Sequence, residues 1–205
     1  MAKTIQMGKR YFIWFLFFLS MLIIIPFFWS TNNKLIKKEE NIMMAWAQVE
    51  NQYQRRSDLI LNLAETVKGY STHEQDAFGQ IIEARANATK TNINIDKLNT
   101  EGLQEYDVKQ SELTHAFARL IMVVESYPDL KANENFIMLQ GQIEGTENRI
   151  SFERKRFNES VKGYNTYRRR FPRNIAALIL DFRKYDYFEA IPESDTKPNV
   201  NFNKQ

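Results

Sequence analysis

The chain has 205 residues, a formal net charge of +3 and no cysteine. This length suits one ordinary domain plus an anchor, the charge is too small to indicate nucleic-acid binding, and the lack of cysteine excludes disulfides, thiolate metal sites and cysteine nucleophiles. Few Gly and Pro, with periodic regions rich in Ala, Glu, Lys, Leu, Arg and Gln, favour an all-α fold.

The first predicted element is a transmembrane anchor over residues 11–29, which follows a short basic amino terminus, residues 1–10. Its sequence, YFIWFLFFLSMLIIIPFFW, has no charged residue and would span roughly 29 Å as a helix, close to the hydrocarbon thickness of a bilayer. The alternative is a cleaved signal peptide, whose cleavage site needs two small residues. Here Ser30 or Thr31 would be paired with a bulky aromatic residue. We therefore expect an uncleaved signal-anchor that crosses the membrane once.

The charges that flank this anchor do not decide its orientation. Three basic residues precede the span and three follow it closely, so the positive-inside rule is balanced. A short basic amino terminus usually stays inside, which favours an amino terminus in the cytoplasm and a carboxyl-terminal domain outside.

Residues 30–41 are expected to form a stalk, and residues 42–170 a four-helix up-and-down bundle in which the first and fourth helices are long and the other two short. The long helices are predicted from apolar residues that alternate at three- and four-residue spacings, a pattern typical of helices packed in a bundle. We call these positions the seam. They are Trp46, Val49, Tyr53, Ile60, Leu63, Val67 and Tyr70 in the first helix, about 33–69, and Phe136, Leu139, Ile143, Ile150, Phe157, Val161 and Tyr164 in the fourth, about 132–170.

The end of the first long helix has two interpretations. Gly69 followed by the capping box Ser71 to Glu74 predicts a break and a second helix over about 72–90. The alternative is an unbroken helix, because the seam spacing continues through Ala77 and Ile81. We expect the break, because the distal half of one unbroken helix would have no partner. Residues 91–102 are the predicted main loop, and a third helix follows and ends before Pro128.

A basic and aromatic segment, residues 171–190, follows the fourth helix at the end that an up-and-down order returns to the membrane. Basic residues flank the apolar run from Ile175 to Leu180, a composition typical of an element at the membrane interface. The alternative is that this run closes the base of the bundle as core. Residues 191–205 are predicted to be a disordered tail. The candidate contacts with a membrane surface or a partner are Arg168, Arg169, Arg170, Arg173, Arg183, Lys184 and Tyr185.

No catalytic, cofactor-binding or metal site is predicted. Glu112 and His115 match the Glu-x-x-His motif of di-iron bundles once, but no second copy exists and both lie off the predicted seam. No nucleophile with an adjacent base and no glycine-rich phosphate loop is visible. We therefore expect a protein that is not an enzyme and has no cofactor, no metal and no evident small-molecule substrate.

Arg56 is the polar exception on the predicted seam. Counted at ~1.5 Å per residue from the membrane end, Arg56 and Glu147 reach similar heights, roughly 39 and 32 Å. We predict a structural ion pair between Arg56 and Glu147, or the nearby Glu144, that fixes the register of the long helices; the alternative is an anion-binding pocket. Gly141 and Gly145 are expected to permit a close approach between helices.

Three groups of residues, which recur in order over most of residues 42–190, carry a family resemblance. The first is Ala45-Trp46, Arg55-Arg56-Ser57-Asp58-Leu59-Ile60, Asn62-Leu63, Val67-Lys68-Gly69-Tyr70, His73-Glu74 and Ala84-Arg85; the second is Tyr127-Pro128-Asp129-Leu130-Lys131-Ala132, Glu134-Asn135-Phe136, Leu139-Gln140 and Glu144-Gly145-Thr146-Glu147-Asn148-Arg149-Ile150; the third is Tyr164-Asn165, Phe171-Pro172, Asn174 and Phe188-Glu189-Ala190. In these blocks the chain resembles the LemA family of bacterial membrane proteins. The resemblance implies a single amino-terminal span and a four-helix up-and-down bundle, and it implies no enzyme activity or cofactor.

Together these features lead us to expect a non-enzymatic helical-bundle protein anchored in the bacterial cytoplasmic (inner) membrane. An interaction or scaffold role in the cell envelope is the leading interpretation, and a signalling or regulatory subunit of a membrane complex is the alternative. The expected partners are the lipid bilayer and a membrane or envelope protein, with no nucleic acid.

Overall fold

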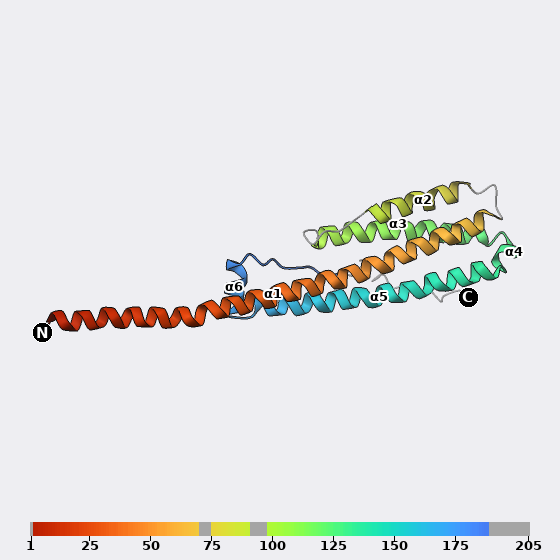
Figure 1. Ribbon diagram of the computed structural model, residues 1–205. Helices are drawn as coiled ribbons and strands as arrows, with labels where there is room; N and C mark the ends of the chain where they lie inside the picture. Colours follow the sequence, from red (N-terminus) through yellow and green to blue (C-terminus); the bar gives the residue numbers. More distant parts are fainter. Residues whose placement is uncertain (1, 70–74, 91–97, 189–205) are drawn as a thin grey trace, which may run out of the picture. The chain divides into compact units, whose positions relative to one another are not determined.

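The computed structural model describes residues 2–69, 75–90 and 98–188, and over these ranges the chain is all-α. A long amino-terminal helix packs against a long later helix, and several shorter helices complete the fold (Figure 1). The helices are α1 (Ala2–Lys68), α2 (Gln75–Lys90), α3 (Thr100–Val124), α4 (Pro128–Lys131), α5 (Glu134–Arg169) and α6 (Arg173–Ile179).

The chain divides into two compact units, and both long helices contribute to each. The first unit joins Met1–Asn51 to Lys155–Tyr185, and the second joins Gln52–Arg154 to Asp186–Gln205.

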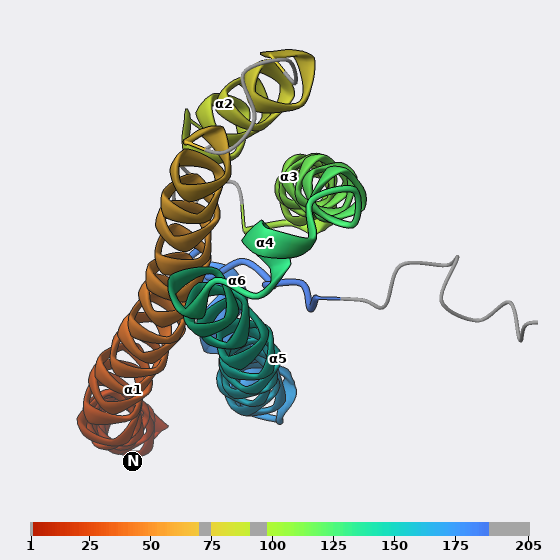
Figure 2. The ribbon, with the colours of Figure 1, turned by 90° about the vertical axis from the view of Figure 1, so that its right-hand side faces the viewer.

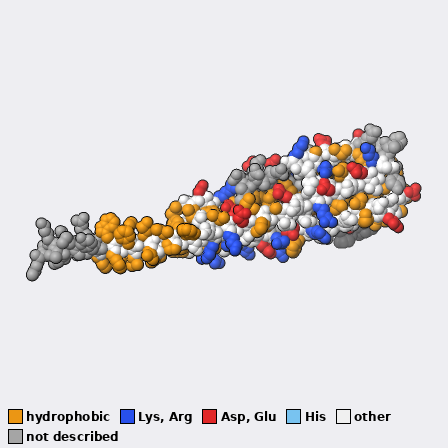
Figure 3. Space-filling model, viewed as in Figure 1, with side chains coloured by type: hydrophobic (Ala, Val, Ile, Leu, Met, Phe, Trp, Pro, Cys, Tyr) orange, Lys and Arg blue, Asp and Glu red, His pale blue; other side chains and the backbone are white. Residues whose placement is uncertain are grey.

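In the first unit, α1 begins with the apolar run. Among the described residues, α1 is the single helix long and apolar enough to cross a membrane. Side chains from Trp14 to Trp29 are exposed or half-buried, and Figure 3 shows them as an apolar band that ends where charged side chains begin. Pro26 lies within α1, which continues beyond it. The described part of the chain thus contains one possible membrane anchor.

Beyond this run, α1 packs against α5 in antiparallel order. The ring of Trp46 meets the ring of Phe157 edge-on, 5.7 Å between centroids, and the Lys38 ammonium lies 5.7 Å from the centre of the Tyr167 ring. Burial on α1 already begins at Thr31 and Leu35. Part of the stretch 30–41, which was expected to form a stalk, is therefore packed in the first unit.

In the second unit, a single apolar core joins five helices. Ile60, Leu63 and Val67 of α1 are buried there. The other fully buried members of this core are Ile81 of α2, Leu113 and Leu120 of α3, and Leu130 of α4, and α5 adds Phe136 and Ile143. Figure 2 views the ends of these helices. In both units the seam residues of the described ranges are buried, as their spacing predicts, apart from Leu139, which is partly buried against this core.

The observed helix boundaries agree in part with those predicted from the sequence. The break is confirmed, because α1 ends at Lys68 and α2 begins at Gln75, although the capping box Ser71 to Glu74 lies outside the described residues. The third helix starts within the expected loop 91–102, because the side chain of Asn99 caps it by accepting the Gly102 N–H at 2.9 Å. The predicted tail, 191–205, also lies outside the described residues.

One short helix was not predicted from the sequence, and one expectation about α5 is wrong. The short helix α4 was not predicted, because four residues are too few to show a helical period. Gly141 and Gly145 do not mediate close packing, since a Cβ atom added at either would meet nothing within 4 Å. Their helix face is open, so the expectation of a close approach there is wrong.

Candidate functional site

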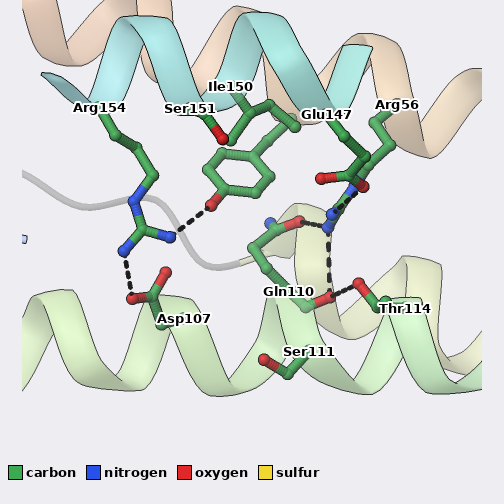
Figure 4. Close-up of a pocket in the computed structure, with 10 residues that line it drawn as sticks. Arg56, Asp107, Gln110, Ser111, Thr114, Glu147, Ile150, Ser151 and Arg154 are labelled. Atoms are coloured by element: carbon green, nitrogen blue, oxygen red, sulfur yellow. Dashed lines mark hydrogen bonds and ion pairs between the residues drawn. The ribbon is translucent and has the colours of Figure 1, made fainter. Parts of the chain in front are cut away.

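Three helices of the second unit converge on Arg56 (Figure 4). Arg56 stands on the α1 seam between Tyr53 and Ile60, so the helical period directs its side chain inward. Only 5% of that side chain is exposed. A buried guanidinium needs both counter-charge and hydrogen bonds, and the neighbouring helices supply both.

The structure brings Arg56 and Glu147 together. Arg56 Nη1 donates to Glu147 Oε1 at 2.8 Å. Its Nη2 donates to Gln110 twice, to the side-chain oxygen at 2.9 Å and to the backbone oxygen at 3.2 Å. The guanidinium also lies 5.0 Å from the centre of the Tyr53 ring, within cation–π range. Arg56 Nε, which is buried, has no hydrogen-bond partner among the described residues.

A second ion pair, which the sequence reasoning missed, lies beside the first. Arg154 Nη2 donates to Asp107 Oδ2 at 2.9 Å, and its Nη1 donates to the Tyr53 hydroxyl at 3.4 Å. The guanidinium also stacks on the ring of Phe188, 4.2 Å from its centre. One feature of the sequence could have indicated that Arg154 lies near the first ion pair: it follows Glu147 by seven residues and so shares its face of α5.

These side chains line a cavity of about 150 Å³. It contains two arginines and two carboxylates, each arginine already paired, so the cavity presents no surplus positive charge to an anion. The arrangement is better suited to fixing the register of three helices than to binding a ligand. The lining residues are Tyr53, Arg56, Asp107, Gln110, Ser111, Thr114, Glu147, Ile150, Ser151 and Arg154.

Burial raises the pKa of the Asp107 carboxyl above its ordinary value, and the charge and hydrogen bond of Arg154 offset only part of this rise. Burial also raises the pKa of the Tyr53 phenol, against the lowering effect of Arg154. Because the folded-state pKa of Asp107 exceeds the unfolded value, its ionisation costs stability as the pH rises from the unfolded pKa through the folded pKa.

Replacing Arg154 with methionine should raise the pKa of Asp107 further, because the substitution removes the one neighbour that chiefly lowers it. Carbon-13 NMR titration of the aspartate carboxyl groups would measure the change. The matched control is Arg149→Gln, at an exposed site on the same helix, which should leave Asp107 unchanged. An unchanged or lowered Asp107 pKa in the Arg154 variant would contradict this assignment.

The basic residues at the end of α5 lie in the first unit and differ in exposure. Arg169 and Arg170 are exposed. Arg168 is half-buried, and its Nε donates to the Phe182 backbone oxygen at 2.6 Å. Arg173 is also half-buried, with its guanidinium 4.2 Å from the centre of the Tyr167 ring. Arg183 and Lys184 are exposed.

Tyr185 differs from the expected surface contact, because its side chain is buried. Its hydroxyl donates to a carboxylate oxygen of Glu39 on α1, and its ring meets that of Tyr164 edge-on, 5.1 Å between centroids. Asn165 holds its backbone from both sides, donating to the Tyr185 oxygen at 2.7 Å and accepting the Tyr185 N–H at 3.3 Å. Tyr185 therefore fastens the segment after α6 to both long helices.

Replacing Tyr185 with phenylalanine should flatten the alkaline loss of stability. Burial, and then the hydrogen bond to Glu39, raise the pKa of Tyr185 to about 12. Its contribution to stability is therefore complete below the unfolded pKa of roughly 10 and is lost as the pH rises through the folded pKa. Urea unfolding at several pH values would measure the slope; an equal slope in the variant would contradict the assignment, and the exposed Tyr187→Phe is the control.

The Glu112 and His115 pair of the sequence analysis lies on α3. His115 is exposed, and Glu112 accepts from Lys109 at 3.0 Å. Within the described residues, no group of three or more His, Asp or Glu could hold a metal ion.

The LemA family model matches residues 45–202, more than half of the chain. The chain belongs to the LemA family. The resemblance noted in the sequence is thereby confirmed, and the LemA match includes both ion pairs around Arg56 as well as α6.

Individual relatives differ in how much of the chain they match. Protein LemA of Metamycoplasma hominis is 24% identical over 189 residues, which cover 92% of this chain and 83% of the relative. Magnetosome protein MamQ of Magnetospirillum gryphiswaldense is 30% identical over 82 residues, 40% of this chain and 30% of the relative. Magnetosome protein MamQ 2 of Paramagnetospirillum magneticum gives the same values. The likeness to the magnetosome proteins is thus local, and the likeness to LemA is nearly full-length.

Proposed function

We propose that this LemA-family protein is a non-enzymatic scaffold of the bacterial cell envelope. In this proposal a single span at 11–29 anchors the chain in the cytoplasmic membrane, with the amino terminus inside. Helices α1, α2, α3 and α5 form a four-helix up-and-down bundle outside, which contacts a membrane or envelope protein.

The observation that carries the proposal is the continuity of α1. One helix, Ala2–Lys68, contains both the apolar run and the buried seam, so the anchor and the packed part of the fold share one element without a linker. The polar cavity around Arg56 supports a non-enzymatic role, because its charged groups satisfy one another.

Cysteine labelling of intact cells tests the placement of the protein, because the natural chain has no cysteine. Ala132, between α4 and α5, is exposed, and unlike Asn133 its side chain does not cap α5. We expect a membrane-impermeant maleimide to label Ala132→Cys and to leave Thr4→Cys unlabelled until the cells are permeabilised. The reverse pattern would place the bundle in the cytoplasm and overturn an envelope role.

Photo-crosslinking tests the scaffold role. A crosslinker at Met138, an exposed apolar site on α5, should give a discrete adduct with one envelope protein, and the exposed polar site Glu144 is the control. The same diffuse pattern at both sites would count against a specific partner.

The continuity of α1 also favours a second function, a regulatory subunit of a membrane complex, because a helix shared by the span and the seam can couple the two. Partner capture separates these roles: a scaffold adduct should form in every state of the cell, and a regulatory adduct should depend on the activity of the complex.

A further inference from the structure

Helix α6 presents its large apolar side chains outward. Ile175, Leu178 and Ile179 follow the spacing of one face of α6, where Leu178 is 79% exposed, and Phe171, which is 80% exposed, lies in the turn just before the helix. We call these four residues the apolar stripe. The small residues Ala176 and Ala177 are buried instead. A surface helix of a soluble protein buries its large apolar side chains, whereas α6 exposes them. An exposed apolar patch of this kind indicates a surface that contacts an apolar environment.

The element that carries the stripe is well defined although it has only seven residues. It ends in a Schellman motif, with the Phe182 N–H donating to the Ala177 oxygen at 2.9 Å and the Asp181 N–H to the Leu178 oxygen at 3.3 Å. Asp181 adopts the left-handed conformation that this motif requires, φ 57°. The hydrogen bonds of Arg168 and Asn165 then hold the following segment, so α6 is fixed on both sides.

The stripe lies close to the end of the apolar run of α1. Tyr167 packs at the level of Lys38, which is about 14 Å beyond Trp29 at ~1.5 Å per residue. Since α5 runs antiparallel to α1, its end at Arg169 is nearer to the run, and α6 follows (Figure 1). A bilayer that held the run would extend roughly 5–8 Å beyond its hydrocarbon on each face, which would bring its headgroup layer close to α6.

The charges around the stripe match an anionic headgroup layer. Arg169 and Arg170 are exposed directly before it, and Arg173 is half-buried within α6. Lys34 and Lys37 are exposed on the facing stretch of α1. Arginines beside bulky apolar side chains are the composition that binds the boundary between headgroups and acyl chains.

From these observations we infer that α6 docks on the bilayer that holds the span, with the apolar stripe in the interface and Arg169, Arg170 and Arg173 on anionic phospholipid headgroups. This inference rests on the proposed membrane anchoring and adds a second, peripheral membrane contact. It also narrows the candidate contacts, because Tyr185 and Arg168 serve the packing that holds α6 in place.

The test uses the full chain in nanodiscs of phosphatidylglycerol and phosphatidylcholine. An environment-sensitive fluorophore is placed on Leu178→Cys, and quenching is measured with two lipids, one brominated near the headgroup to report on the interface and one brominated near the end of the acyl chain to report on the middle of the span. Leu19→Cys, within the span, reports insertion, and Ile82→Cys on α2 is a comparably exposed apolar control. We expect strong quenching at Leu178 and Leu19 and none at Ile82.

Quenching at the three sites distinguishes a failure of the proposed membrane anchoring from a failure of the proposed docking of α6. No quenching at Leu19 would mean that the span is not inserted, and the anchoring would fail. Quenching at Leu19 without quenching at Leu178 would overturn the docking of α6 alone. Fluorescence at Leu178 that depends on protein concentration and not on brominated lipid would overturn it in favour of contact with a second copy of the chain.

Charge variants test the lipid chemistry. The double variant Arg169→Gln, Arg170→Gln should lower the ratio of docked to undocked α6 by about fivefold per arginine in anionic nanodiscs. Arg149→Gln, at an exposed site far along α5, should change nothing. Equal docking of the natural chain in purely neutral nanodiscs would contradict the role of the arginines.

Discussion

Replacing Glu147 with alanine should destabilise the second unit by about 3 kcal/mol, more than replacing its partner Arg56 with methionine, at about 1–2 kcal/mol. The reason is unequal burial. The Arg56 side chain is 5% exposed and would be left as a buried cation, whereas the Glu147 side chain is 49% exposed and can be hydrated when Arg56 is gone. Urea unfolding of the full chain in detergent, followed by far-ultraviolet circular dichroism, would measure both changes.

The double variant completes the test. Once Arg56 is methionine, replacing Glu147 with alanine should be nearly neutral, because its cost in the natural chain arises from the unpaired guanidinium. Additive costs in the double variant would show that the two side chains are not coupled. A larger cost for the Arg56 variant would show that the bonds to Gln110 matter more than the ion pair.

Replacing Phe157 with alanine should destabilise the first unit by about 3–5 kcal/mol. Its ring is fully buried and packs edge-on against Trp46, so the substitution leaves a cavity between the two long helices. The matched control is Phe152→Ala on the same helix, whose side chain is 59% exposed and whose loss should cost less than about 0.5 kcal/mol.

The same unfolding measurement distinguishes these phenylalanines. Similar costs for the two variants would mean that the face of α5 has been assigned wrongly. Tryptophan fluorescence gives an independent signal, since Trp46 should move to a more polar environment in the Phe157 variant and should be unaffected in the Phe152 variant.

The long helices could be predicted from the sequence because their information is local. Alternating spacings place Trp46, Val49 and Phe157 on buried faces, and Gly69 and Pro128 mark helix ends. Helix α6 could be located but not oriented. Its apolar run fits a buried or an exposed face equally well, and only the packing of its alanines shows which side is covered.

The ion pairs could likewise be predicted from the sequence only in part. Arg56 could be singled out because a charge on an apolar seam is locally anomalous, and helix heights suggested Glu147. Asp107 and Arg154 carry no such anomaly, since each reads as an ordinary solvated charge on its own helix. The bond from Tyr185 to Glu39 joins residues 146 positions apart, a separation that no local period encodes.

Because α1 is uninterrupted, the number of residues between the span and the packed part of the helix fixes the direction in which the packed face points. Between Trp29 and the first buried position, Thr31, there is no loop to absorb a change, so one inserted residue would rotate the packed face of the first unit by about 100° relative to the span. Seven inserted residues would nearly restore the original direction, within about 20°. Length variation just outside the bilayer should therefore be tolerated in whole heptads and rejected in single steps.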